Sequence, residues 1–124
     1  NNLTQLPELP NSLKYLDCEN NNLTELPELP NSLEHLNCIN NNITQLPELP
    51  DSLKYLNFNN NNINIIKLPK IPYSLEYLSC YKNNLPYNNL EEYIYYIKKH
   101  KYLIDKYGYD EAMNILSSTN KFNL

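Results

Sequence analysis

A twenty-residue phrase that recurs along the chain is the feature that most restricts its fold. Each repeat opens with a phrase like NNLTQLPELPNSL, which occupies residues 1–13, 21–33 and 41–53. A fourth copy of the repeat covers 61–82, with two extra residues at Ile65-Ile66. A fifth copy begins at Asn83 and is then abandoned. Self-similarity at a fixed short period predicts a solenoid, in which each repeat contacts its neighbours and stacking supplies the core.

A second pattern, L-x-x-L-x-L-x-x-N-x-L, lies between the proline-containing phrases. Its first copy consists of Leu13, Leu16, Cys18, Asn21 and Leu23. The alternation of apolar residues predicts one short strand per repeat, around Tyr15-Leu16-Asp17 and its equivalents. The Leu-Pro-Glu-Leu-Pro phrase cannot be helical, because proline donates no backbone hydrogen bond and disfavours α geometry in the residue before it. We therefore expect an extended, polyproline-like return segment.

These repeats resemble the short bacterial-type leucine-rich repeats of type III secreted effectors, including those fused to effector ubiquitin ligases. They are also similar to Asn-rich repeats in proteins of amoeba-infecting giant DNA viruses. The resemblance covers about residues 1–85 and implies an α/β solenoid used for protein recognition. The implied form is a leucine-rich-repeat horseshoe with short parallel concave strands, an extended proline-rich convex side and a C-terminal helical cap. Ligase activity is not implied, because the helical catalytic domain of those ligases has no counterpart here.

The composition changes at Pro86, which predicts two parts: the repeats over 1–85 and a helical cap over 86–124. Asn89 followed by Glu92 has the spacing of a capping box, and Gly108 suits a helix end. Apolar residues between them fall on one helical face: Leu90, Tyr93, Ile94, Ile97, Ile104 and Tyr107.

A second short helix is expected from Asp110 to about Ser117. The chain opens in the middle of the pattern at Asn1, so we expect that further repeats or an N-terminal cap precede it in the full protein.

Composition excludes several classes of function. The 124 residues suit one domain, and the net charge of −4 with a pI near 5.1 lacks the basic footprint of a nucleic-acid-binding protein. No apolar run is long enough to span a membrane. No set of residues with the spacing of a catalytic triad is found, and neither a C-x-x-C motif nor a nearby histidine suggests a metal site. The sequence therefore predicts a protein that is not an enzyme and uses no cofactor.

Three cysteines, Cys18, Cys38 and Cys80, occupy an apolar inward position that Phe58 fills in the third repeat. Side by side in parallel strands they suit a disulfide poorly, so we expect small buried hydrophobic residues. Unbridged thiols favour a reducing, intracellular compartment, which is the host cytoplasm if the protein is viral or an effector.

Equivalent residues of stacked strands should form columns, in which neighbouring members are about 4.8 Å apart. The inward asparagines should bond the backbone of adjacent turns, forming a structural asparagine ladder: Asn21, Asn41, Asn61 and Asn83. A column that alternates in sign should fix the stacking register: Lys14, Glu34, Lys54 and Glu76.

The predicted partner-binding residues lie on the concave face, where exposed tyrosines beside small polar groups are typical of binding hot spots. They are Tyr15, Asp17, His35, Asn37, Ile39, Tyr55, Asn57, Tyr77, Ser79 and Tyr81. The column of Glu19, Ile39, Asn59 and Tyr81 differs most between copies, either because it is shaped for one partner or because the position tolerates drift. Aromatic stacking that merely stabilises the sheet is the alternative for the tyrosines.

The sequence thus predicts a protein–protein interaction module that binds a partner, such as a host-cell protein, through its concave sheet. Two alternatives stay open: the substrate-recognition fragment of a larger effector enzyme such as a ubiquitin ligase, and glycan binding through the tyrosine column. No nucleic acid or membrane is expected as a partner. Self-association through the open N-terminal edge of the sheet remains a further expectation.

Overall fold

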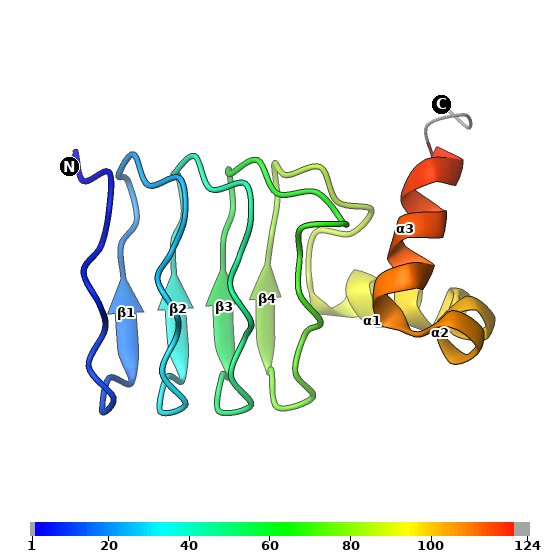
Figure 1. Ribbon diagram of the computed structural model, residues 1–124, viewed down its shortest axis with the longest axis horizontal. Helices are drawn as coiled ribbons and strands as arrows, with labels where there is room; N and C mark the ends of the chain where they lie inside the picture. The colour runs from blue at the N-terminus through cyan, green and yellow to red at the C-terminus, as the bar shows by residue number, and fades with distance from the viewer. Residues whose placement is uncertain (1, 121–124) are drawn as a thin grey trace.

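The computed structural model describes residues 2–120 as a stack of four repeats followed by three helices (Figure 1). The sheet contains β1 (Tyr15–Asp17), β2 (His35–Asn37), β3 (Tyr55–Asn57) and β4 (Tyr77–Ser79). The strands are parallel, are ordered β1-β2-β3-β4, and pair in register from one repeat to the next. The predicted solenoid with short parallel strands is confirmed.

Each repeat turns two corners, and the residues at these corners explain the small number of glycines. Before each strand a turn is closed by a backbone hydrogen bond, such as that from Leu33 N to Pro30 O at 3.1 Å. After the strand the chain adopts a left-handed conformation at Asn20, Asn40, Asn60 and Lys82, with φ between 57° and 59°. Asparagine tolerates this conformation better than most other residues. The repeats therefore bend without glycine.

The core lies between the sheet and the return segments, which carry neither helix nor strand over 22–30 and 42–50. Leucines and isoleucines from both sides meet there, together with the three cysteines and Phe58. Leu36, Leu56 and Phe58 have no exposed surface. Because each repeat contributes only a thin layer, burial depends on the repeat above and below, as stacking requires.

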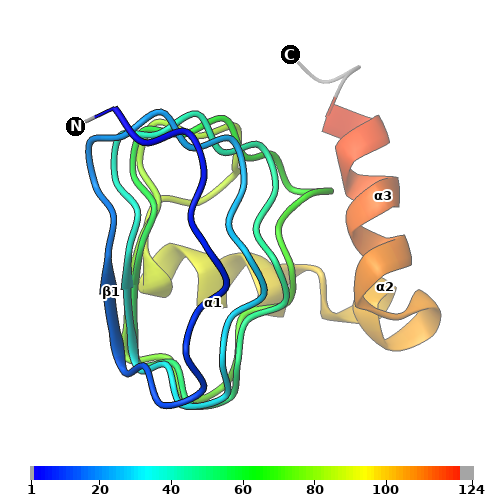
Figure 2. The same cartoon turned by 60° about the vertical axis from the view of Figure 1, so that its left-hand side comes forward.

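The C-terminal residues close the far end of the stack. Cys80 N donates to Asn88 O at 2.9 Å, and Ser79 forms an antiparallel bridge with Asn89. The chain then enters α1 (Leu90–Lys99), which lies across the end of the sheet (Figure 2). Tyr87 is buried and meets the Tyr93 ring edge to face, with 5.1 Å between ring centroids. The end of the core is thereby covered.

The capping box forms with a shift of one residue. Asn89 Oδ1 accepts a hydrogen bond from Glu92 N at 2.9 Å, as the sequence predicts for an N-cap. Glu92 Oε1 accepts from Asn88 N, also at 2.9 Å, rather than from the N-cap residue itself.

The prediction of one continuous helix from Asn89 to Gly108 was wrong. The helix breaks at His100 into α1 and α2 (Lys101–Tyr107), and α2 ends at Gly108 with φ 84° as predicted. Ile94 and Tyr107, which were expected on the buried face, are exposed. The break changes the direction of the chain before the third helix. The spacing of apolar residues in the sequence does not predict such a break.

The third helix, α3 (Tyr109–Asn120), is longer than predicted and includes Asp110 in its first turn rather than before it. It packs on the two-residue insertion of the fourth repeat, which projects toward it (Figure 2). Ile65 is 5% exposed in a second apolar cluster with Ala112, Met113 and Leu116. The insertion therefore anchors the helical cap.

Candidate functional site

Four aromatic rings form a continuous stack on the outward side of the sheet, which we call the sheet face and which corresponds to the predicted concave face. Ring centroids are 4.0 Å apart between Tyr15 and His35, 4.0 Å between His35 and Tyr55, and 4.6 Å between Tyr55 and Tyr77. Neighbouring rings are within 11° of parallel. In-register pairing causes this, since it places equivalent side chains directly beside each other.

The stack remains accessible along its length. Tyr15 and Tyr77 are 58% and 47% exposed, and His35 and Tyr55 are half-buried. His35 and Tyr55 have a ring against both faces, whereas Tyr15 and Tyr77 have one on a single face. Desolvation lowers the pKa of His35, against the opposing effect of the nearby Asp17 carboxylate. The lowered pKa favours the neutral form of the histidine within the stack.

The second column of the sheet face changes from exposed to buried along the solenoid. Asp17 is exposed and Asn37 is half-buried, whereas Asn57 and Ser79 are only 6% and 4% exposed. The role of Asn57 and Ser79 in binding stays a prediction, and burial leaves little of either side chain accessible to a partner. Asn59 Oδ1 accepts hydrogen bonds from Ser79 Oγ at 2.8 Å and from Tyr81 N at 2.7 Å.

In a recurrent hydrogen bond, each of the first three residues of the second column accepts from the backbone N–H two residues further along the chain. The Oδ1 atom of Asp17 accepts from Glu19 N at 3.2 Å, and that of Asn37 accepts from Ile39 N at 3.2 Å. Asn57 makes the same bond. This role was not predicted from the sequence. The pattern that indicates it is an Asp or Asn whose side chain accepts a hydrogen bond from the backbone N–H two residues later.

The third column supplies less apolar surface than expected. Ile39 is half-buried rather than exposed, and Asn59 is engaged by Ser79 and by Tyr81 N at 2.7 Å. Glu19 and Tyr81 remain exposed, at opposite ends of the column. Accessible chemistry on the sheet face is thus concentrated in the aromatic stack and at the two ends.

The alternating charges pair across neighbouring rungs. Lys14 Nζ lies 3.8 Å from Glu34 Oε2, and Lys54 Nζ lies 3.8 Å from Glu76 Oε2. All four side chains are well exposed, so each pair contributes only a few tenths of a kcal/mol. Each pair places a carboxylate beside one of the two lysines of residues 2–66.

The inward asparagines bond the backbone of two repeats each. Asn41 Nδ2 donates to the carbonyl oxygens of Cys18, Cys38 and Ile39 at 3.1–3.3 Å, and its Oδ1 accepts from Leu23 N at 3.0 Å. Equivalent bonds are made by the other members of the column, Asn21, Asn61 and Asn83.

A second, exposed ladder runs beside it through the left-handed residues. Asn60 Nδ2 donates to Asn40 Oδ1, and Asn40 Nδ2 donates to Asn20 Oδ1, both at 2.7 Å. This ladder was not predicted, although the Asn triplets at 20–22, 40–42 and 60–62 indicate it.

The thiols are buried and unbridged, and their chemistry is suppressed. Burial raises the pKa of Cys18 to about 11 and that of Cys80 to about 12, and it raises the pKa of Cys38 further. Within the part of the chain that the structure describes, no three metal-ligating side chains come together. Over the same residues, no helix is long and apolar enough to cross a membrane.

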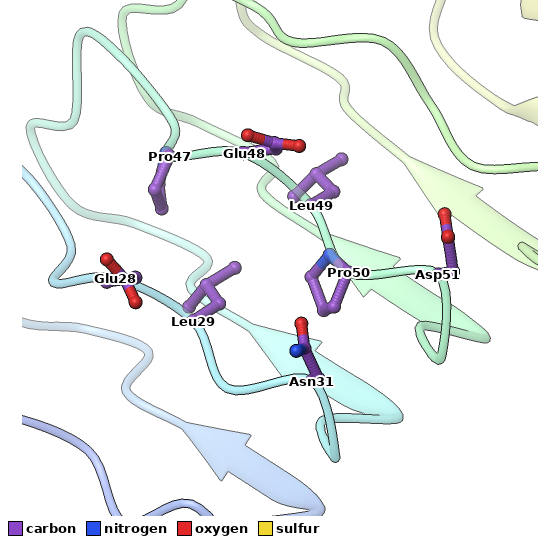
Figure 3. Close-up of a pocket in the computed structure, with 8 residues that line it drawn as sticks. All are labelled: Glu28, Leu29, Asn31, Pro47, Glu48, Leu49, Pro50 and Asp51. Carbon is purple, nitrogen blue, oxygen red and sulfur yellow. The ribbon is translucent and has the colours of Figure 1, made fainter.

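A shallow hollow lies on the opposite, proline-rich side, between two return segments (Figure 3). It is lined by Glu28, Leu29, Asn31, Pro47, Glu48, Leu49, Pro50 and Asp51. Leu29 and Leu49 are already buried in the core, so the hollow offers mainly carboxylates and proline rings. It brings together no set of groups that would orient a small ligand.

Comparisons with known proteins agree with this geometry. A family model for two copies of leucine-rich repeats matches residues 11–51, and a second leucine-rich-repeat model matches residues 52–73. Together they cover about half of the chain. A comparison with curated proteins gives no match.

Among solved structures, the chain is similar to YopM from Yersinia enterocolitica WA-314, with 38% identity and a TM-score of 0.52. The match covers 68% of this chain and 23% of YopM, so the chain spans less than a quarter of that protein.

Proposed function

Because the chain belongs to the leucine-rich-repeat proteins, we propose that it binds another protein and that the sheet face is where this protein docks. Repeats of this family form protein-interaction scaffolds, built so that side chains on one face vary while the core is kept. The proposed partner is a protein of a host cell, and the proposed place of binding is the host cytoplasm. We infer no catalytic role for the described residues.

The aromatic stack is the observation that carries this proposal. Three tyrosines and a histidine are held side by side on four hydrogen-bonded rungs, with Tyr15 and Tyr77 about half exposed. Tyrosine loses little conformational entropy on binding, and stacked rings have lost most of it already. A rigid row of ring edges and hydroxyls is the kind of surface on which binding energy is concentrated in protein interfaces.

Glycan binding through the tyrosine column is less compatible with the geometry. A sugar bound by aromatic stacking needs a free ring face, but His35 and Tyr55 have both faces covered by rings 4.0–4.6 Å away. Only the outer faces of Tyr15 and Tyr77, at the two ends of the stack, lack a neighbouring ring of the column. The remaining alternative is that the chain recognises substrates for a larger effector enzyme. That alternative uses the same surface, and it differs only in what the rest of the full protein does.

Site-specific photocrosslinking tests the proposal, with two tyrosines as a matched pair. Tyr77 lies on the sheet face and is 47% exposed, whereas Tyr73 is fully exposed at the turn that follows the proline-rich segment of the same repeat. Each is replaced by p-benzoylphenylalanine, folding is checked by circular dichroism, and the proteins are irradiated in host-cell lysate. We expect a discrete adduct from position 77 and none from position 73.

Equal adducts from both positions, or an adduct from position 73 alone, would contradict docking on the sheet face. An adduct whose mass is twice that of the chain would instead identify self-association. Sedimentation of the unmodified protein over a range of concentrations checks this outcome independently.

A further inference from the structure

Negative charge is concentrated in the first three repeats. Residues 2–66 hold eight carboxylates and two lysines, a net charge of −6, whereas residues 67–124 hold eight lysines and six carboxylates, a net charge of +2. Each of the two lysines of the first part lies 3.8 Å from a carboxylate, that of Glu34 or that of Glu76. The field over the first repeats therefore attracts a positively charged partner and repels an acidic one.

Two carboxylates of this region, those of Asp17 and Glu19, lie together on the first rung of the sheet face. The later copies replace this pair by uncharged residues, at 37 and 39, at 57 and 59, and at 79 and 81. Both acidic side chains are exposed, and neither belongs to an ion pair formed within residues 2–120. The charge is thus a local feature of one rung and not a property of the repeat.

The two carboxylates are also held in place. Asp17 Oδ1 accepts a hydrogen bond from Glu19 N at 3.2 Å, and Glu19 Oε2 accepts one from Asn37 Nδ2 at 3.1 Å. A carboxylate has room for about four hydrogen bonds. Each group is therefore oriented by one bond and keeps most of its accepting capacity, which lowers the entropic cost of binding a cation.

The opposite end of the sheet face is aromatic. Tyr77 and Tyr81 are each 47% exposed on the fourth rung, on either side of the buried Ser79. Three steps of about 4.8 Å separate the first rung from the fourth, a distance of about 14 Å. The sheet face is acidic at one end and aromatic at the other.

We infer that the partner presents an extended segment with an arginine or lysine over Asp17 and Glu19 and an apolar side chain over Tyr77 and Tyr81. An extended chain advances about 3.3 Å per residue, so it covers about 14 Å in four residues. Residues four apart point to the same side of a strand, and both can therefore face the sheet. Arginine suits the first rung best, because its planar guanidinium can bond two carboxylate oxygens at once.

This inference rests on the proposed function, because it names the partner's chemistry on the same face. The test uses a phage library of random twelve-residue peptides, selected on the immobilised protein. Selections are run in parallel on the wild type, on Asp17→Asn/Glu19→Gln, and on Glu28→Gln/Glu48→Gln. The last variant removes two exposed charges from the proline-rich side, so both variants change the net charge by the same amount.

We expect the wild type and Glu28→Gln/Glu48→Gln to enrich peptides with a basic residue four positions from an apolar one. The Asp17→Asn/Glu19→Gln variant should lose the basic preference, and the enriched peptides should bind it about ten-fold more weakly by fluorescence anisotropy. An equal loss with both variants would overturn the inference, since it would reduce the effect to net charge. Enrichment of no peptide on the wild type would overturn it as well.

The outcomes separate this inference from the proposed function. Suppose that the enriched peptides lack a basic residue and no longer bind the Tyr77→Ala variant. This result would overturn the inference but would still support docking on the sheet face. Basic peptides whose binding depends on Glu28 and Glu48, and not on Asp17 and Glu19, overturn both.

Discussion

Replacement of Asn41 by alanine should destabilise the protein more than any single surface change. The side chain makes four hydrogen bonds and is 6% exposed. Three of these reach carbonyl oxygens that keep a second donor, since Cys18 O also accepts from Asn21, Cys38 O from Asn61, and Ile39 O from a backbone N–H. The fourth partner, the Leu23 N–H, loses its acceptor inside the core.

The magnitude follows from these two kinds of loss. An orphaned buried N–H costs about 1–3 kcal/mol, and each hydrogen bond lost from a carbonyl that keeps another donor costs about 0.5 kcal/mol. Asn41→Ala should therefore lower the free energy of unfolding by about 2.5–4.5 kcal/mol. That is a large fraction of the roughly 5–15 kcal/mol by which small domains are stable.

Urea denaturation followed by circular dichroism measures this loss, with Asn42→Ala as the matched control. Asn42 is the next residue in the same triplet, its side chain is exposed, and the Asn42 N–H that bonds Leu23 O is kept by alanine. We expect the control to change stability by less than about 0.5 kcal/mol. Amide exchange at Leu23 should accelerate only in Asn41→Ala. Equal effects of the two substitutions would refute the assigned role of the ladder.

Three further outcomes are expected. Ile65→Ala should lower the free energy of unfolding by about 2–4 kcal/mol. The rate of amide exchange should rise more in α3 than in β2. An equal rise in both would contradict anchoring of the cap by the insertion. Burial raises the pKa of Cys18 to about 11 and that of Cys38 further. The thiols of the folded protein should therefore react with iodoacetamide at pH 8 far more slowly than those of the unfolded protein. Equal rates would contradict burial of the thiols. Since the pKa of His35 is lowered in the fold, stability should fall as the pH drops below about 6.5. His35→Tyr should remove that part of the dependence in urea titrations at pH 5 and 7, and an unchanged slope would contradict the lowered pKa.

Much of the fold could be predicted because buried residues recur at the same position in every repeat. A residue such as Leu16 recurs at one offset in every copy, so the pattern identifies the buried positions without knowledge of the turns between them. The strand centred on Leu16 and its three equivalents lie where the pattern places them. The N-cap at Asn89 and the helix end at Gly108 could be read in the same way, because both depend on a few adjacent residues.

The helical cap could be predicted only in part, because its geometry depends on contacts that are distant in sequence. The helix breaks at His100, Ile94 is exposed, and α3 packs on Ile65, a residue more than forty positions earlier in the chain. A 3.6-residue periodicity cannot tell one long helix from two helices that turn toward a protruding loop.

The sheet face shows the same division. Which residues form columns could be predicted from the repeat, since equal spacing places Tyr15, His35 and their equivalents side by side. Which members of a column are accessible could not be predicted. Asp17 and Asn57 occupy equivalent positions, yet one is exposed and the other is 6% exposed. Accessibility depends on what lies over a residue, which neighbouring rungs and the cap supply, whereas periodicity reports only the direction in which its side chain points.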